Sequence, residues 1–317
     1  MRKFRIGSRD AGCIALGSSY FGTTWAEEDC FRLMDRFLEL GGDCLDTARV
    51  YGAWFNDQYG AAERVIGKYL EDKRLQGKVI VVTKGGNPLP QSIYTRRLSR
   101  GEIIDDIKRS LDDLRLAKID MYLLHRDDED RSAGEIIETM NELLSLGYTS
   151  GIGCSNWRSD RIREANRYAV EYGLRGFEVS QIQWSLAETT PELYGDDTIV
   201  CMNESEYEFY KSEKFPLMAY ASQAKGFFAK GAVGGVESLG KKALERFGTE
   251  KNLRRLEIVK RLSEEKRISP AAIALQVITD SELLPMAIIG CRTIEQLEDT
   301  LSPANLTSQE LEMLRKG

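Results

Sequence analysis

The chain has 317 residues, 42% of them hydrophobic, so it is long enough for two ordinary domains or one large α/β domain. Its net charge of -6, with 44 basic and 50 acidic residues well mixed, argues against a nucleic-acid partner, which usually requires concentrated positive charge. There is no membrane-length apolar run, no signal-peptide pattern and no Cys/His spacing for zinc, so we expect a reduced, cytoplasmic protein without a metal.

Short apolar runs alternate along the chain with longer stretches of helical periodicity. Eight of the short runs are predicted to be strands: Cys13–Leu16, Asp43–Asp46, Val79–Lys84, Met121–His125, Ser150–Ser155, Phe177–Gln181, Leu217–Tyr220 and Met286–Ile289. Helices are predicted from about Glu27, after the capping box Ser99–Glu102, and over Gly134–Leu146. This alternation implies parallel strands joined by crossover helices.

Two architectures have this alternation, a closed (β/α)8 TIM barrel and an open doubly wound sheet. The number of strands and the chain length favour the barrel. The first strand is also not followed by the Gly-x-Gly-x-x-Gly of a dinucleotide-binding open sheet. We therefore expect a single barrel domain over residues 1–317 that ends in a C-terminal helix. Residues 186–206 and 226–240 are predicted to be loops on one rim, the second being glycine-rich and suited to a mobile lid.

Polar or ionisable residues end most of the predicted strands: Asp46, Lys84, His125, Ser155, Asn156, Gln181 and Tyr220. The carboxyl ends of barrel strands meet at one mouth, where the reactive groups of such enzymes lie. Any one of these residues is more often structural than functional. Their succession around the barrel, with His125 as the only histidine of the chain, favours a functional site.

The order of these residues resembles the aldo-keto reductase superfamily over nearly the whole chain. The matching segments are the DTARVYG motif at Asp46–Gly52, then Lys84, His125, Gly153–Asn156, Gln181, Tyr220 and Ile289–Leu297. The segment Ala221–Gly226 resembles a bacterial branch of the family. Many members have Pro-Gly where this chain has Ile289-Gly290, and Glu-Asn where it has Asp299-Thr300, so the adenine contacts are expected to differ.

The resemblance implies a catalytic group of Asp46, Tyr51, Lys84 and His125. Reduction of a carbonyl by hydride builds negative charge on its oxygen, so an acid must donate a proton there. A tyrosine has an ordinary pKa near 10, and a neighbouring ammonium lowers it. We expect Tyr51 to be the general acid, Lys84 to supply the ammonium, Asp46 to hold Lys84 charged, and His125 to orient the carbonyl oxygen.

No side chain can supply a hydride, so a nicotinamide cofactor is expected, NADPH/NADP+ rather than NADH. Ser155, Asn156 and Gln181 suit its carboxamide, and the resemblance assigns Tyr220 as the stacking surface. Phosphates need N–H groups and positive charge, and Arg292 is the candidate for the 2′-phosphate. The full set of expected cofactor residues is Ser18, Ser155, Asn156, Gln181, Tyr220, Ser222, Lys225, Gly290, Arg292 and Gln296.

The expected substrate is a small carbonyl compound, either a sugar or an aryl aldehyde or ketone. Each of the four tryptophans, Trp25, Trp54, Trp157 and Trp184, follows a predicted strand by a few residues, which suggests an aromatic wall at the mouth. Trp25, Trp54 and Trp184, together with Arg126, are the predicted substrate pocket. The sequence leaves the oligomeric state open.

Two other functions are compatible with the same barrel. Lys84 could act as the nucleophile of a Schiff-base lyase, which requires a lysine of depressed pKa, whereas Asp46 is expected to keep it protonated. Alternatively, the chain could be a cofactor-binding sensor or regulatory subunit with little turnover. The intact group of Asp46, Tyr51, Lys84 and His125 favours the reductase.

Overall fold

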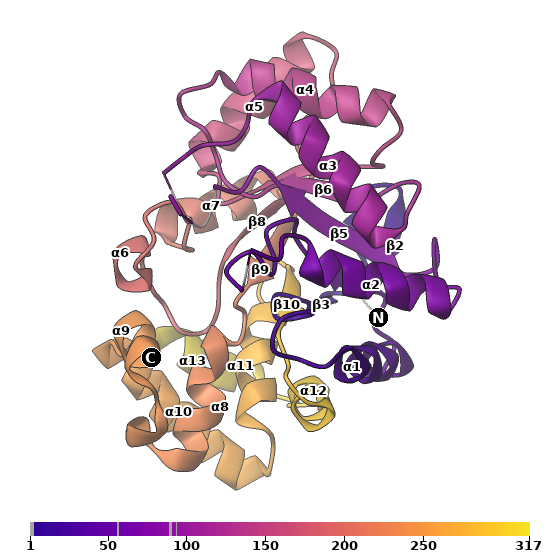
Figure 1. Cartoon of the computed structure of the whole chain (residues 1–317). Coiled ribbons are helices and arrows are strands. Elements are labelled where there is room, and N and C mark those ends of the chain that lie inside the picture. Colours follow the sequence, from indigo (N-terminus) through magenta and orange to yellow (C-terminus); the bar gives the residue numbers. More distant parts are fainter. Residues whose placement is uncertain (1–2, 56, 89–90, 93) are drawn as a thin grey trace.

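The structure, a computed structural model, describes residues 3–55, 57–88, 91–92 and 94–317 (Figure 1). Its central feature is a closed barrel of parallel strands in the order β10-β3-β4-β5-β6-β7-β8-β9. The strands are β3 (Ile14–Gly17), β4 (Cys44–Asp46), β5 (Ile80–Gly85), β6 (Met121–Leu124), β7 (Ile152–Ser155), β8 (Ser180–Gln183), β9 (Leu217–Tyr220) and β10 (Met286–Ile289). The predicted (β/α)8 barrel is confirmed.

The strand bounds agree closely with those expected, except that β8 begins three residues later than predicted. Phe177, the expected first residue, is instead bonded to the side chain of Asn166. Its N–H donates to Asn166 Oδ1 (2.7 Å) and its carbonyl accepts from Asn166 Nδ2 (3.1 Å). Because both backbone groups of Phe177 are used in this way, β8 pairs with its neighbours only further along the chain.

Helices lie around the barrel (Figure 1), and each of them buries an apolar stripe. They are α1 (Glu27–Glu39), α2 (Ala61–Asp72), α3 (Arg100–Leu114), α4 (Ala133–Ser145), α5 (Ser159–Glu171), α7 (Glu204–Glu213), α10 (Glu250–Lys266), α11 (Pro270–Thr279), α12 (Ile294–Leu301) and α13 (Ser308–Lys316). The expected capping box starts α3: Ser99 and Glu102 bond each other's backbone N–H. Among the described residues, no helix has the length and apolar character needed to cross a membrane.

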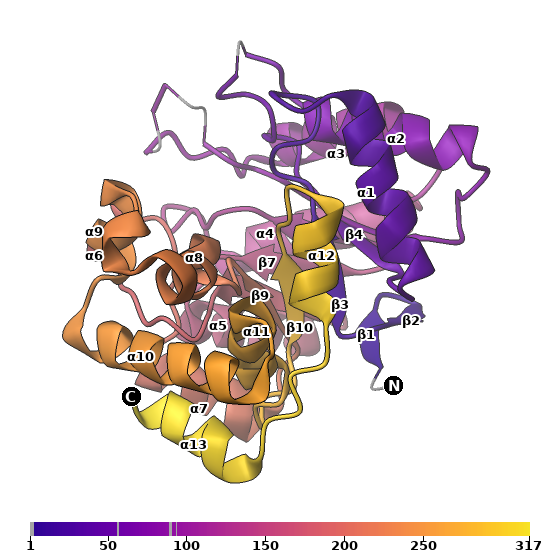
Figure 2. The ribbon, with the colours of Figure 1, turned by 90° about the horizontal axis from the view of Figure 1, so that it is seen from below.

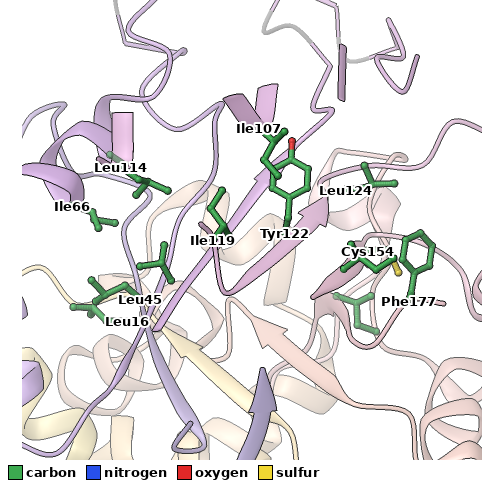
Figure 3. Packing of buried hydrophobic residues seen from close by; sticks show 14 of the residues in the cluster. Leu16, Leu45, Ile66, Ile107, Leu114, Ile119, Tyr122, Leu124, Cys154 and Phe177 are labelled. Atoms are coloured by element: carbon green, nitrogen blue, oxygen red, sulfur yellow. The ribbon is translucent and has the colours of Figure 1, made fainter. Parts of the chain in front are cut away.

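Side chains alternate between the two faces of each strand, which separates two layers of core. Residues such as Ile80, Val82 and Leu123 belong to one buried cluster with residues of the opposite strands, inside the barrel. Residues such as Val81 and Tyr122 belong to the larger cluster between strands and helices. Figure 3 shows part of this outer layer, with Tyr122 of β6 beside Ile107 of α3.

The expected loop at residues 226–240 contains a helix, α8 (Phe227–Gly234), followed by a short 3-10 turn, η2 (Val236–Ser238). Phe227 and Phe228 are buried with Phe247 of α9 (Lys241–Phe247) and Leu256 of α10. These buried phenylalanines anchor the segment, which is therefore not the open glycine-rich loop that the sequence suggested. Figure 2 shows α8, α9 and α10 grouped on one side of the barrel. The other expected loop, 186–206, contains the single-turn α6 (Pro191–Tyr194), packed against α9, and the start of α7.

A hairpin of β1 (Phe4–Ile6) and β2 (Arg9–Ala11), absent from the predicted elements, precedes the barrel. Phe4, Ile6 and Ala11 pack into the inner barrel cluster, at the end opposite the carboxyl ends of the strands. Three-residue strands such as FRI and RDA are too short to show a period in the sequence.

Candidate active site

Three buried polar side chains form a hydrogen-bonded chain inside the carboxyl end of the barrel. Lys84 Nζ donates to Asp46 Oδ1 and to the carbonyl of Thr47, both at 2.7 Å. Gln181 Nε2 donates to the other Asp46 oxygen at 2.9 Å. Asp46 and Lys84 point to the inside of the barrel, because side chains alternate along a strand. Asp46 lies two residues after the inward-facing Cys44 of β4, and Lys84 lies two residues after the inward-facing Val82 of β5.

Lys84 is a protonated ammonium in this environment. Burial alone lowers the pKa of Lys84, but the charge and hydrogen bond of Asp46, with a further contribution from Tyr51, outweigh burial and raise it. A buried ammonium is tolerated because its partner is a buried carboxylate at hydrogen-bond distance.

Tyr51 lies between this lysine and the single histidine. Lys84 Nζ is 5.3 Å from the centre of the Tyr51 ring, and the His125 ring is 6.0 Å from it at 75°. Burial raises the pKa of Tyr51 above its ordinary 10, and the ammonium of Lys84 lowers it without overcoming burial. The expected effect of Lys84 is therefore present, and the tyrosine keeps its proton near neutral pH.

His125 follows β6 and is fixed by its backbone N–H, which donates to the carbonyl of Gly85 at 2.8 Å. Burial, with the nearby charges of Arg126 and Lys84, lowers the pKa of His125 well below 6.5. Its Nδ1 is buried and has no hydrogen-bond partner among the described residues. The imidazole is thus neutral, and it can donate a hydrogen bond without competing with Tyr51 as a proton donor.

Asn156 joins three strand ends. Its Oδ1 accepts from the Tyr220 hydroxyl (2.8 Å) and from Val200 N–H (3.2 Å). Its Nδ2 donates to the carbonyl of His125 (3.2 Å) and to Ser155 Oγ (3.1 Å). Of the expected carboxamide-binding residues, Ser155 and Asn156 are therefore bonded to each other, whereas the Gln181 side chain bonds Asp46. A ligand that bonds the Asn156 amide must replace one of the Asn156 contacts.

Two expected cofactor residues make backbone contacts. The Ser18 hydroxyl donates to the carbonyl of Asp46 at 2.9 Å, and the Ser222 hydroxyl donates to that of Ile288 at 2.7 Å. Both side chains are buried and tie neighbouring strand ends together. Near the start of α12, Gln296 accepts from Arg292 N–H through its side chain (2.9 Å), and Gly290 N–H donates to Gln223 (3.3 Å).

A cluster of three basic residues lies beyond β9. Lys225 has a left-handed backbone, as do Ala221, Ala224 and Gly226 around it. Lys225 is exposed at its surface, and partial desolvation of its ammonium beside the barrel mouth, together with the charges of Arg246 and Arg292, lowers its pKa. Lys225, Arg246 and Arg292 are absent from the ion pairs formed within the described parts of the chain. Uncompensated positive charge beside left-handed backbone is a feature of anion sites.

Arg246 is the one residue of this cluster that the sequence did not single out. It lies on α9, and its guanidinium stacks over the ring of Tyr194 of α6 at 4.2 Å. No pattern in the sequence links residue 246 to the barrel mouth.

The predicted pocket residues fall in different surroundings. Trp54 is 50% exposed and lies edge-on to Tyr51 at 5.8 Å. Trp25 packs on Tyr20 and Phe21, Trp184 packs on Tyr207, and Trp157 is fully buried. Trp54 is thus the tryptophan in contact with Tyr51, and Trp157 is part of the core rather than of a rim wall.

Arg126 holds a loop in place. Its guanidinium donates to Thr198 Oγ1 (2.9 Å), to Asp196 (3.3 Å) and to the carbonyl of His125 (2.9 Å). It also lines a cavity of about 450 Å³ together with Tyr94, Asn156 and residues 197–201. The cavity lining carries both arginines and carboxylates, so it has no strong preference for either charge.

The closed barrel and the polar group at its mouth define a (β/α)8 protein with an enzyme-like site. The aldo/keto reductase family model matches residues 12–316, so the chain belongs to this family, as the sequence predicted. It is similar to the norsolorinic acid reductase of Emericella nidulans, 27% identical over 322 residues that cover 95% of this chain and 74% of that protein.

Two further relatives match nearly the whole chain. The uncharacterized oxidoreductase YrpG of Bacillus subtilis is 27% identical over 308 residues, 95% of this chain and 90% of that protein. The putative aryl-alcohol dehydrogenase AAD14 of Saccharomyces cerevisiae is 24% identical over 344 residues, 98% of this chain and 85% of that protein. The family and these relatives support an oxidoreductase.

Proposed function

We propose that the protein is an NADP(H)-dependent carbonyl reductase that converts an aldehyde or ketone to the alcohol, with Tyr51 as the general acid. The observation that carries the proposal is the placement of one tyrosine ring 5.3 Å from the Lys84 ammonium and 6.0 Å from the imidazole of His125, at the mouth of the barrel. Membership of the aldo/keto reductase family supports the same reaction class.

Each side chain has a separate task. Tyr51 gives its proton to the carbonyl oxygen, and the Lys84 ammonium stabilises the phenolate that remains. Asp46 keeps Lys84 charged and in place through their 2.7 Å bond. The neutral His125 donates a hydrogen bond to the carbonyl oxygen and orients it toward Tyr51. NADPH, when bound, supplies the hydride.

The residues present fit a dinucleotide phosphate. Lys225, Arg246 and Arg292 form a cationic cluster without an acidic partner among the described residues, and Lys225 is held in a run of left-handed backbone. We assign Arg292, beside the N-terminus of α12, to the 2′-phosphate, and Lys225 and Arg246 to the bridging phosphates.

An aryl aldehyde or ketone is the substrate class we favour. The half-exposed Trp54 ring contacts Tyr51 and offers an aromatic surface beside the acid. One relative is named a putative aryl-alcohol dehydrogenase, which suits the same class. Sugars also stack on tryptophan, so a carbonyl panel must include both.

Replacement of Tyr51 by phenylalanine tests the acid. Tyr51→Phe keeps the ring but removes the proton, so carbonyl reduction should fall by roughly 10²- to 10⁴-fold, the usual contribution of a general acid. NADPH affinity, measured by fluorescence titration, should be nearly unchanged. Tyr172→Phe, on the exposed end of α5, is the matched control and should keep wild-type turnover. Wild-type turnover in Tyr51→Phe would reject Tyr51 as the acid.

The same measurements separate the two other functions. The raised pKa of Lys84 disfavours a Schiff-base lyase, and borohydride should therefore trap no substrate adduct on this residue. Tight NADPH binding without oxidation across a broad aldehyde and ketone panel would instead favour a cofactor-binding sensor.

Replacement of Arg292 by alanine tests the choice of cofactor. The variant should bind NADPH roughly 10- to 100-fold more weakly, the range for losing hydrogen bonds to a charged group, and should bind NADH almost as the wild type does. Arg109→Ala, on the exposed face of α3, is the control for loss of one positive charge. An equal loss of affinity for both nucleotides would remove Arg292 from the 2′-phosphate site.

A further inference from the structure

A buried ionic network lies outside the barrel, behind the end of β5. Glu63 of α2 is fully buried; one carboxylate oxygen accepts from the Thr83 hydroxyl at 2.6 Å and the other from Arg49 Nη1 at 3.2 Å. The same Arg49 nitrogen also donates to Asp113 of α3. The network therefore joins α2, α3 and β5 to the turn that follows β4.

This network is connected both to the turn that carries the proposed proton donor, Tyr51, and to the strand that carries its ammonium partner, Lys84. Thr83 directly precedes Lys84, and the backbone N–H of Arg49 donates to the carbonyl of Lys84 at 2.9 Å. Arg49 lies two residues before Tyr51, in a turn closed by the bond from Tyr51 N–H to the carbonyl of Ala48 (3.0 Å). One carboxylate, that of Glu63, thus holds the strand that carries Lys84 and the turn that carries Tyr51.

Gly60 shows how closely the Arg49 side chain is confined. It has a φ of +70°, and a Cβ at this position would overlap the Arg49 guanidinium and the Asp113 carboxylate. Its N–H donates to the carbonyl of Arg49 at 2.8 Å, so backbone and side chain of Arg49 are both fixed at the start of α2.

Buried ion pairs are expensive to desolvate and contribute little net stability compared with apolar residues of similar size. Their geometric effect is larger, because a planar guanidinium between two carboxylates accepts few arrangements. We propose that Arg49 and Glu63 are positioning residues that set the place of Tyr51 relative to Lys84 and His125. This inference rests on the proposed reductase function.

The test compares Glu63→Gln with Glu63→Asp and a matched control, Asp120→Asn. Asp120 bonds the opposite end of the same strand: it accepts from Val81 N–H at 2.9 Å and from Arg9 at 3.3 Å. Both replacements remove a carboxylate that pairs with an arginine and holds β5, but only Glu63 is linked to the Tyr51 turn. A loss of stability is expected in both.

Two quantities separate positioning from stability. In Glu63→Gln, kcat for carbonyl reduction should fall roughly 10- to 100-fold, because an acid displaced by about 1 Å can cost that much, while KM and NADPH affinity stay near wild type. Glu63→Asp, which keeps the charge, should recover part of kcat. Asp120→Asn should keep wild-type kcat.

The second quantity does not depend on turnover. His125 is the only histidine, so its ring protons can be followed alone by NMR, and their shifts depend on the ring current of Tyr51 at 6.0 Å. These shifts should move in Glu63→Gln and remain in place in Asp120→Asn. If Glu63→Gln does not fold, Arg49→Lys, which keeps the charge but not the planar fork, takes its place.

The outcomes distinguish the two proposals. A wild-type protein that reduces no carbonyl rejects the proposed function, and the His125 shifts then still decide the positioning role. Unchanged kcat and unchanged His125 shifts in a folded Glu63→Gln variant, or equal changes in Asp120→Asn, would overturn the positioning of Tyr51 by Arg49 and Glu63.

Discussion

The protonation state of His125 is set by its surroundings in the fold. At the end of an apolar run, a lone histidine is usually structural, and its protonation state cannot be read from the sequence. In the structure, burial and two neighbouring cations, Arg126 and Lys84, lower the pKa of His125 well below 6.5. The imidazole that faces Tyr51 is therefore neutral near pH 7.

This lowered pKa predicts how stability depends on pH. The unfolded histidine takes up a proton near pH 6.5 and the folded one does not, so the stabilisation is complete above that pH and is lost as the pH falls. The limiting slope is about 1.4 kcal/mol per pH unit. Urea unfolding of wild type and His125→Asn between about pH 8 and pH 5 should give curves that converge toward acid pH.

Asp127 makes the comparison with the variant necessary. Burial raises the pKa of Asp127 from 3.8 to about 6, so its protonated form is favoured in the folded state. Its stabilisation is complete below pH 3.8 and is lost as the pH rises through about 6, which is opposite in sign to that of His125. The contribution of Asp127 to the free energy of unfolding is the same in wild type and in His125→Asn, so it cancels in the difference between them. Parallel curves would contradict a neutral buried His125.

At the scale of secondary-structure elements, the sequence predicted the barrel because its strands carry a clear signal. An apolar run that ends in a polar residue of inward parity, as at Asp46, Lys84 and His125, indicates both the strand and the residue at its mouth. The helices α1, α3 and α4 were predictable for the same reason, since their periodicity lies within one segment, as do the capping serines of α3 and α4.

The remaining elements depend on contacts between distant segments. The helix α8 forms where glycines suggested a loop, because its phenylalanines are buried against α10. Arg246 reaches the basic cluster only because α9 packs beside α6. Arg49 was visible inside the family motif but without a partner, and Glu63 became its partner through the packing of α2 against the barrel and α3. Such pairings have no local pattern.

At the scale of the whole molecule, the two ends of the barrel have different tasks. The carboxyl ends of the strands carry the proposed chemistry, and the opposite end is covered by the β1–β2 hairpin, whose Phe4 and Ile6 enter the inner core. Arg9 of the hairpin donates to the carbonyl of Val79 (3.1 Å) and to Asp120 (3.3 Å). Stability and activity should therefore respond separately to changes at the two ends.

Gly7, in the turn of the hairpin, tests this separation. It has a φ of +53°, and a Cβ there would lie 2.5 Å from the carbonyl oxygen of Asp120. Gly7→Ala should cost about 2–4 kcal/mol, from left-handed backbone strain and overpacking together. Gly147→Ala is the control, because Gly147 has a φ of +75° with open space around it, and it should cost only about 1 kcal/mol.

Both variants should keep the wild-type kcat per folded molecule, because neither residue contacts the mouth of the barrel. Unfolding in urea gives the stability change, and turnover at a temperature where both variants are folded gives kcat. Equal destabilisation by the two replacements would mean that the close contact between residue 7 and the carbonyl of Asp120 adds no cost to the left-handed backbone strain. A fall in kcat confined to Gly7→Ala would mean that the packing of the hairpin affects the position of the catalytic residues at the opposite end of the barrel. The effect would be transmitted through β5, which Asp120 bonds at Val81.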